Sequence, residues 1–249
     1  MEAIVLVGGL GTRLREVVPD LPKPMAPVNG RPFLEYLLEF WIGQGLDHVV
    51  LATGYKHEII QNHFGKKYGP LSIDYSIEET LMGTGGAVFQ SLEKIQGGNS
   101  FFVINGDTFF PVDTKSLLAF HQRRGSGLTM VLRTMPEAKR YGSVKTGVDG
   151  RVLEFCPPGH GSPPFMINAG TYLCNKIFLE NTHIERNERI PVSLESDLFP
   201  SWISGKKDFY GWPSSGDFID IGIPEDYRKC QDLFQNRKIN FDDPIRETK

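Results

Sequence analysis

A buried strand that runs directly into a glycine-rich turn opens the chain and limits what it can fold into. The apolar run Ile4-Val5-Leu6-Val7 predicts a first strand that is covered on both faces. Gly8, Gly9 and Gly11 follow at once. A backbone without Cβ atoms can approach a phosphate closely and direct its N–H groups at it. The chain therefore begins with a strand and a loop suited to holding phosphate, as the first unit of an α/β fold.

Two cations stand close to this turn. Arg13 follows the third glycine by two residues, and Lys23 lies in Pro22-Lys23-Pro24-Met25. Arginine suits a bidentate phosphate contact, and lysine acts as a point charge. The Gly-Lys-Ser/Thr ending of the P-loop is absent, and the dinucleotide fingerprint would need a glycine where Leu14 stands. The alternative is a strand-to-helix turn with an incidental arginine, but the combination with Lys23 favours a nucleoside triphosphate.

Strand and helix patterns alternate along the first half of the chain, which predicts βαβ units and a largely parallel sheet. Strands are expected at residues 48–52, 71–77, 101–104 and 128–132, and helices at 32–44, 58–64, 83–94 and 114–123. Beyond residue 140 the pattern shifts to shorter strands at 143–145, 152–155, 166–173 and 218–221, with helices near 193–199 and 224–234.

We therefore predict a single-domain, Rossmann-like (GT-A-like) α/β fold over residues 1–236, with a mixed, mostly parallel central sheet. A nucleotide half covers about residues 1–135, and a smaller β subregion lies in the second half, about 136–236. Residues 237–249 are polar and are expected to form a weakly structured tail.

Composition excludes several classes of function. The net charge is −3, which argues against a general nucleic-acid or membrane-surface binder. The apolar runs are far too short to span a bilayer. The first strand begins at residue 3 or 4 with no signal peptide ahead of it. Three widely spaced cysteines fit reduced thiols rather than disulfides or a metal site. We expect a cytoplasmic protein, and a homo-oligomer is compatible with the sequence.

Two aspartates are candidate metal ligands. Asp107 follows an apolar strand and one glycine, and Asp220 lies in the strand-like Phe218-Ile219-Asp220-Ile221-Gly222. Ligands of open α/β sheets bind beyond the carboxyl ends of the strands, so both aspartates should reach the crevice of the glycine loop. Mg²⁺ prefers one or two carboxylates together with phosphate oxygens. Each aspartate alone could equally be a turn or cap residue, but together with the loop they favour a magnesium site.

The motifs taken together resemble those of the sugar-1-phosphate nucleotidylyltransferases, from Ala3 to about Leu233. Within this family the chain looks most like the D-glycero-α-D-manno-heptose 1-phosphate guanylyltransferases, because of residues 22–27 and 32–35. The matching motifs are Gly8-Gly9-Leu10-Gly11-Thr12-Arg13-Leu14, Pro22-Lys23-Pro24-Met25, Gly83-Thr84-Gly85-Gly86-Ala87, Asn105-Gly106-Asp107-Thr108, Tyr141-Gly142, Ile167-Asn168-Ala169-Gly170, Ser193-Leu194-Glu195 and Phe218-Ile219-Asp220-Ile221-Gly222.

The resemblance implies an enzyme that transfers GMP from GTP to a heptose 1-phosphate with Mg²⁺, releasing pyrophosphate. The implied catalytic residues are Arg13, Lys23, Asp107 and Asp220, of which Asp107 and Asp220 hold the metal. The implied nucleotide-binding residues are Leu6, Gly8, Gly9, Gly11, Thr12, Arg13, Lys23, Glu79, Gly83, Thr84 and Gly106. The implied sugar-phosphate-binding residues are Asp107, Tyr141, Gly142, Glu154, Asn168 and Gly170.

One departure from the family concerns the acceptor phosphate. Relatives carry a Glu-Lys pair shortly before the Asn-Ala/Gly-Gly segment, whereas the corresponding residues 154–158 of this chain contain no lysine. Lys145, Arg140 and Arg151 are the candidate substitutes, and Lys145 is preferred because it lies on a predicted strand. Alternatively, the proline- and glycine-rich stretch 157–164 supplies backbone N–H groups, or the metal carries the phosphate.

Other readings of the sequence stay open. Another base or sugar, such as mannose 1-phosphate, fits the same motifs, and either Glu78 or Glu79 could accept hydrogen bonds from guanine. A non-catalytic, nucleotide-sugar-binding regulator is favoured by the missing lysine and disfavoured by the intact phosphate loop and aspartates. A metal-dependent glycosyltransferase would usually show Asp-x-Asp, whereas this chain has Asp107-Thr108-Phe109.

Overall fold

A mixed β-sheet forms the centre of the molecule in the computed structural model, which describes residues 1–137, 140–161, 163–182 and 191–236. Four neighbouring strands of this sheet are parallel: β7 (Ser100–Asn105), β1 (Glu2–Leu6), β4 (His48–Thr53) and β6 (Leu71–Ile77). The short β5 (Lys67–Tyr68) closes the edge beside β6 and runs antiparallel to it. This half corresponds to the βαβ units that the sequence predicts.

The second half of the sheet is mainly antiparallel. The long β12 (Phe165–Asn175) pairs with β7 on one side and with β9 (Leu128–Met135) on the other. β10 (Ser143–Thr146) and β11 (Val152–Cys156) extend the sheet from the first part of β12, and β13 (Phe209–Ser214) runs parallel to β9. Two small ribbons stand outside the main sheet, β2–β3 (Pro27–Val28, Arg31–Pro32) and β8–β14 (Thr108–Phe109, Ile219–Asp220).

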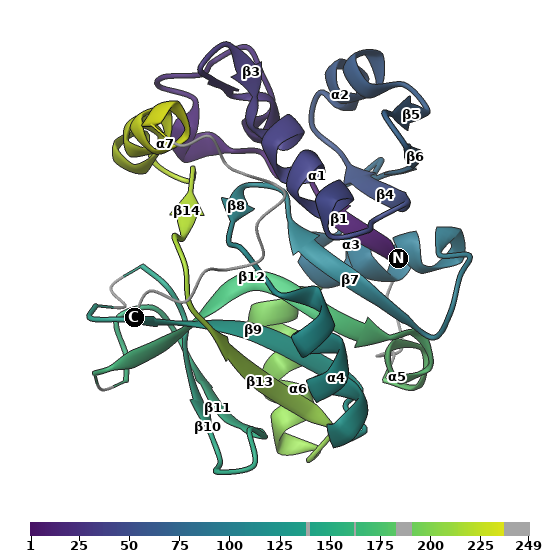
Figure 1. Ribbon diagram of the computed structural model, residues 1–249, viewed down its shortest axis with the longest axis vertical. Coiled ribbons are helices and arrows are strands. Elements are labelled where there is room, and N and C mark those ends of the chain that lie inside the picture. Colours follow the sequence, from purple (N-terminus) through teal and green to yellow (C-terminus); the bar gives the residue numbers. More distant parts are fainter. Residues whose placement is uncertain (138–139, 162, 183–190, 237–249) are drawn as a thin grey trace.

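Helices cover both faces of the sheet, because alternate residues of the central strands are apolar on each side. Val5 packs in one core with residues of α1 (Phe33–Gly43), α2 (His57–Phe64), α4 (Thr114–Arg124) and α7 (Pro224–Asn236). Ile4 packs in the other with residues of α3 (Gly83–Ser91), α5 (Lys176–Asn181) and α6 (Phe199–Ser204). Figure 1 shows this arrangement, with α1 and α7 beside the N-terminal strands and α6 behind β13.

Several elements differ from the sequence prediction, among them helix α5, which was not predicted. Strand β13 was not predicted, because Gly211 and Pro213 are both depleted in strands. The helix expected at 193–199 begins as a π-helix at Leu194–Leu198 and continues through α6 to Ser204. The last predicted strand shortens to the two residues of β14. The predicted tail at 237–249 lies outside the described residues, and no described helix is long and apolar enough to cross a bilayer.

The parallel strands bring the loops that follow β1, β4 and β7 to one edge of the sheet. Hydrogen bonds join the strand ends, from Val7 N to Ala52 O at 2.9 Å and from Gly106 N to Leu6 O at 2.9 Å. A Cβ on Gly106 would lie 2.4 Å from Val7 Cγ1, so the glycine permits this close approach. The glycine loop after β1 and Asp107 after β7 therefore leave the sheet side by side, as the sequence predicts.

Candidate active site

The glycine loop borders a cavity of about 600 Å³, which we call the glycine-loop cavity. It is lined from β1 and the following loop, from the start of α3 and from the end of β7. The lining residues are Leu6, Val7, Gly8, Gly9, Leu10, Gly11, Thr12, Arg13, Lys23, Pro24, Ala52, Glu78, Leu81, Gly83, Thr84, Ala87, Asn105, Asp107, Pro191 and Gly222. Most of the predicted nucleotide-binding residues thus line one cavity.

Two of the loop glycines meet a steric requirement. Gly11 has φ of 59° and precedes the 3₁₀ turn Thr12–Leu14, a left-handed conformation that favours glycine. A Cβ on Gly8 would lie 2.5 Å from Glu78 Oε1. Gly8 therefore leaves room for the Glu78 carboxylate at the wall of the cavity.

Lys23 lies at the inner end of the cavity, between two carboxylates. Its Nζ is 2.5 Å from Asp107 Oδ2 and 3.9 Å from Asp220 Oδ1, and its side chain is only 12% exposed. It comes from the turn Lys23–Met25, which Pro22 leads in an extended conformation. Arg13 lines the same cavity. Both cations that the sequence assigns to phosphate therefore face one space.

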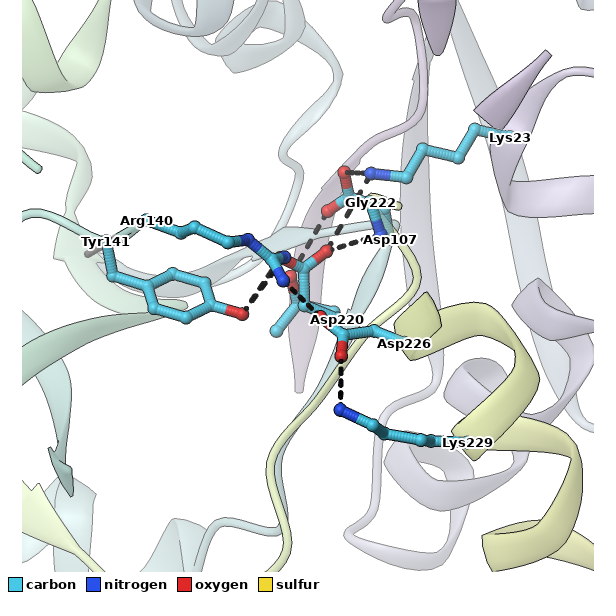
Figure 2. Close-up of polar contacts among 9 residues, drawn as sticks. Lys23, Asp107, Arg140, Tyr141, Asp220, Gly222, Asp226 and Lys229 are labelled. Atoms are coloured by element: carbon cyan, nitrogen blue, oxygen red, sulfur yellow. Dashed lines mark hydrogen bonds and ion pairs between the residues drawn. The ribbon is translucent and has the colours of Figure 1, made fainter. Parts of the chain in front are cut away.

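Strand pairing brings the two aspartates together. Asp220 lies opposite Thr108 in the β8–β14 ribbon, and Ile221 N donates to Asp107 O at 3.1 Å. Asp220 Oδ1 also accepts from Gly222 N at 2.7 Å, which fixes the direction of its carboxylate. Residues more than 100 positions apart in sequence thus form one acidic pair (Figure 2).

The two carboxylates differ in their electrostatic surroundings. Burial favours the neutral acid at Asp107, but the Lys23 ammonium outweighs it and holds the pKa of Asp107 below its usual value. Burial and the negative charge of Asp107 raise the pKa of Asp220, against the opposing effects of Lys23, Gly222 N–H and Arg140. Two partly buried like charges at one place call for cations beside them.

The acidic pair has the chemistry that a divalent cation needs. Carboxylate oxygens are hard ligands, and Mg²⁺ is usually held by one or two of them plus substrate phosphates and water. No cluster of three or more His, Cys, Asp or Glu side chains suited to a metal occurs in the described part of the chain. The protein would therefore supply two ligands, and the substrate would complete the coordination.

The cavity wall beyond the end of β6 differs from the prediction for one residue. Glu79 is exposed and does not line the glycine-loop cavity, whereas its neighbour Glu78 does. Successive residues at a strand end point in opposite directions, so only one of the pair can face the crevice. Glu78 Oε2 accepts from Met82 N at 2.9 Å, and burial raises the pKa of Glu78.

Thr84 lines the cavity but its hydroxyl is engaged elsewhere. It donates to Glu195 Oε2 at 2.9 Å and accepts from Leu194 N at 2.8 Å. Gly83, with φ of 73°, leaves no room for a Cβ, which would lie 2.5 Å from Val192 O. These two residues therefore hold the segment 191–195 against α3 and so shape the wall.

The sugar-side residues divide into two groups. Tyr141 Oη donates to Asp220 Oδ2 at 3.2 Å, which places it at the acidic pair. Asn168 Oδ1 accepts from Gly170 N at 2.9 Å, and Gly170, with φ of 72°, packs on Asn105. Gly142 packs against the ring of Phe155, which leaves no space for a side chain.

The second group consists of Lys145 and Glu154, which pair with each other. Lys145 Nζ lies 2.6 Å from Glu154 Oε2, and their side chains are 57% and 52% exposed on the β10–β11 ribbon. Neither residue lines the glycine-loop cavity. The preferred substitute for the missing lysine is thus paired with a residue predicted to bind the sugar. The 157–161 part of the proline-glycine stretch packs on Ser143, whose Oγ donates to His160 O at 2.7 Å.

A second cavity, of about 460 Å³, adjoins Asp220 on the side of α7. We call it the Arg140 cavity. Its lining residues are Met135, Glu137, Arg140, Tyr141, Phe218, Ile219, Asp220, Asp226, Lys229, Cys230 and Leu233. Arg140 was predicted from the sequence only as an alternative, and Asp226 was not predicted. The only sequence signal for Asp226 is its place in the acidic first turn of α7.

The profile of the nucleotidyl transferase family matches residues 2–237, which is nearly the whole chain. The chain belongs to the nucleotidyl transferase family. The match includes the glycine loop, Lys23 and both aspartates, so family membership and the geometry of the cavity agree.

Two curated relatives and one solved structure are similar over almost their full length. The chain is 46% identical to a D-glycero-alpha-D-manno-heptose 1-phosphate guanylyltransferase of Aneurinibacillus thermoaerophilus, over 95% of this chain and 99% of the relative. It is 37% identical to the enzyme of that name from Campylobacter jejuni, over 91% and 97%. A crystal structure of HddC from Yersinia pseudotuberculosis complexed with GMP-PN has 33% identity and a TM-score of 0.80, over 94% and 99%.

Proposed function

We propose that the protein transfers GMP from GTP to D-glycero-α-D-manno-heptose 1-phosphate, giving a GDP-heptose and pyrophosphate. The observation that carries this proposal is a cavity of about 600 Å³ lined by Lys23 and Asp107, with Asp220 Oδ1 3.9 Å from Lys23 Nζ. It occurs in a chain that matches two heptose 1-phosphate guanylyltransferases over more than nine-tenths of their length. The protein is an enzyme of the nucleotidyl transferase family.

The reaction needs no dedicated base. A sugar 1-phosphate has a second pKa near ~6, so at neutral pH its oxygen is already an anionic nucleophile. This oxygen forms a bond to the α-phosphorus of GTP, and the bond from that phosphorus to the bridging oxygen of the β-phosphate breaks. Pyrophosphate leaves with the electron pair. Catalysis therefore rests on positioning and on neutralising charge.

Each part of this task falls to particular side chains. Arg13 and Lys23 would contact the triphosphate and offset the charge of the departing pyrophosphate. Asp107 and Asp220 would hold Mg²⁺, which supplies charge neutralisation at the phosphates when bound. Tyr141, with Gly142, Asn168 and Gly170, would line the acceptor side. The shared cavity supports the roles of Arg13 and Lys23, and the hydrogen bond from Tyr141 to Asp220 supports the role of Tyr141.

Glu78 supports guanine as the base. Its Oε2 is held by Met82 N, and its Oε1 stands over Gly8 at the cavity wall. An ionised carboxylate accepts hydrogen bonds, and guanine offers N1–H and N2–H₂ as donors on one edge. Adenine presents no comparable pair of donors, so a carboxylate here would favour GTP.

The state of the cysteines bears on the cellular setting. All three cysteines are free thiols and are buried, which fits a reducing compartment. We place the reaction in the cytoplasm on this basis. We further propose that residues up to about 135 serve the nucleotide and residues 136–236 the acceptor, since the glycine loop and Tyr141 lie in these two halves.

A matrix of nucleoside triphosphates against sugar 1-phosphates, read by pyrophosphate release with Mg²⁺, tests the proposal. GTP with the manno-configured heptose 1-phosphate should give the highest kcat/KM, with mannose 1-phosphate and glucose 1-phosphate as acceptor controls. Nucleotide binding without turnover in any combination would instead support the regulatory alternative.

A further inference from the structure

The acceptor phosphate has to approach two carboxylates, and this creates an electrostatic problem. The inference that follows rests on the proposed function. A sugar 1-phosphate carries nearly two negative charges at neutral pH, and it must come close to Asp107 and Asp220. Lys23 already lies 2.5 Å from Asp107 and lines the nucleotide side. A second cation on the acceptor side would offset the remaining repulsion.

Most of the nearby cations in the described second half of the chain have their charge committed elsewhere. Lys145 pairs with Glu154 on the exposed ribbon at 2.6 Å. Arg151 donates to Lys207 O at 2.8 Å and to Asp208 Oδ1 at 3.1 Å. Neither contacts Asp220.

The charge of Arg133 is also committed elsewhere. It donates to Gly216 O, and its Cζ lies 5.8 Å from the ring centroids of both Phe110 and Phe218. Its guanidinium is therefore engaged with a carbonyl and two aromatic rings rather than with the acidic pair.

Arg140, unlike these cations, lies beside Asp220. Its Nη1 lies 2.5 Å from Asp226 Oδ2 on α7, while its Nη2 is 3.4 Å from Asp220 Oδ2 and 3.4 Å from Tyr141 Oη. Its side chain is 35% exposed and lines the Arg140 cavity. Figure 2 shows the guanidinium beside Tyr141, Asp220 and Asp226. Lys23 lies on the opposite side of Asp220.

The two arms of this guanidinium are bound unequally. Nη1 makes a charge-assisted hydrogen bond to Asp226, whereas the 3.4 Å separation of Nη2 from Asp220 Oδ2 is at the limit of hydrogen bonding. The planar fork can keep Nη1 on Asp226 while Nη2 exchanges Asp220 for a better acceptor. A phosphate with nearly two negative charges is such an acceptor.

We propose that Arg140 is the cation that contacts the acceptor phosphate, and that Asp226 is a positioning residue that holds the guanidinium for this contact. Arg140 thereby takes over the contact that a lysine of residues 154–158 would make, from a different segment of the chain. The acidic pair is then flanked by Lys23 on the nucleotide side and by Arg140 on the acceptor side.

Steady-state kinetics with separate KM values for the two substrates test this assignment. Arg140→Gln should raise the KM for the sugar 1-phosphate about tenfold or more and leave the KM for GTP within about twofold, because the lost contact belongs to the acceptor alone. Arg140→Lys keeps the charge without the fork and should recover part of the loss. Asp226→Asn should raise the same KM by less.

A matched variant controls for the loss of an arginine–aspartate pair. Arg151 pairs with Asp208 at 3.1 Å and lines neither cavity, so Arg151→Gln removes such a pair without touching Arg140. Both KM values should stay unchanged. Calorimetric titration of the sugar 1-phosphate into protein saturated with a non-hydrolysable GTP analogue gives a second readout, in which Arg140→Gln should weaken binding by the same factor.

Each of the following results would overturn the proposal. The first is an unchanged acceptor KM in Arg140→Gln together with a raised one in Lys145→Gln, which would assign the contact to Lys145. The second is an equal rise in both KM values with a higher Mg²⁺ requirement, which would show that Arg140 acts through Asp220. The third is wild-type protein that turns over no sugar 1-phosphate, which removes the proposed function itself. An active wild type with an unaffected Arg140→Gln removes only this inference.

Discussion

The ammonium nitrogen of Lys23 lies 2.5 Å from Asp107 Oδ2 and 3.9 Å from Asp220 Oδ1. The lysine thus balances two carboxylates that strand pairing forces together. Its side chain is buried, so solvent screens these interactions less than it would on the surface. Any triphosphate that enters the cavity meets a cation whose position is already set by the two acids, and this preorganisation is what electrostatic catalysis requires.

Neutralising either aspartate should stop turnover without unfolding the protein. Asp107→Asn and Asp220→Asn each remove one negative charge and keep the volume, so the predicted metal ligand is lost. We expect kcat to fall at least ~100-fold, equivalent to about 2.7 kcal/mol of transition-state stabilisation. Pyrophosphate release over a range of Mg²⁺ concentrations measures this, with thermal unfolding as the folding control. Near-normal kcat at saturating Mg²⁺ would remove that residue from the metal site.

Arg13 is expected to need its guanidinium and not merely its charge. Arg13→Lys loses the planar fork that suits phosphate, and we predict a drop in kcat/KM for GTP of about tenfold or more, or ~1.4 kcal/mol. Arg15→Lys is the matched control, because Arg15 lies 4.5 Å over the ring of Tyr55 and does not line the cavity. Equal kinetics for wild type and Arg13→Lys would show that the fork is not used.

The choice of base is predicted to depend on Glu78 and not on Glu79. Glu78→Gln places an amide donor near guanine donors, and a buried donor left unpaired costs about 1–3 kcal/mol. The kcat/KM for GTP should fall about tenfold while that for ATP does not fall. Glu79→Gln alters an exposed neighbour and should change neither value. The idea fails if both variants keep the same ratio of GTP to ATP activity as the wild type.

Stability in acid should depend on Glu2 at the opposite edge of the sheet. Glu2 accepts from Gln96 N at 3.0 Å and from Gly97 N at 2.5 Å, and its Oε1 lies 2.6 Å from His48 Nδ1. Burial favours the neutral acid, but these hydrogen bonds outweigh it and lower the pKa of Glu2 below its usual value. A lowered folded-state pKa stabilises the fold above the unfolded-state pKa, about 4.3, and this contribution is lost as pH falls through the folded-state value.

Glu2→Gln should therefore lower the free energy of unfolding by about 2 kcal/mol at pH 7, the order of a hydrogen bond to a charged group. At pH 3 the difference between variant and wild type should shrink. Urea unfolding at the two pH values measures both quantities. A difference of the same size at pH 3 and pH 7 would mean that the carboxylate charge is not what stabilises this edge.

The patterns that could be predicted from sequence are local ones. The apolar strand before Gly8, Gly9 and Gly11 predicts the phosphate-facing loop, because the chain can turn tightly only where side chains are absent. Asp107 could be placed with that loop, since parallel strands end at one edge of the sheet. The alternation of strands and helices was sufficient to predict an α/β fold with a mixed sheet.

Only the tertiary structure distinguishes the positions of neighbouring or competing side chains. Glu78 and Glu79 have the same chemistry, and the direction of the strand end puts only Glu78 in the cavity. Lys145 and Arg140 are both cations beside Tyr141, but Lys145 lies on the exposed face of a ribbon, while Arg140 meets α7 and Asp220. A sequence pattern records the period of a strand or helix. The distance between side chains eighty residues apart depends instead on strand register and on packing between elements, and no local pattern records these.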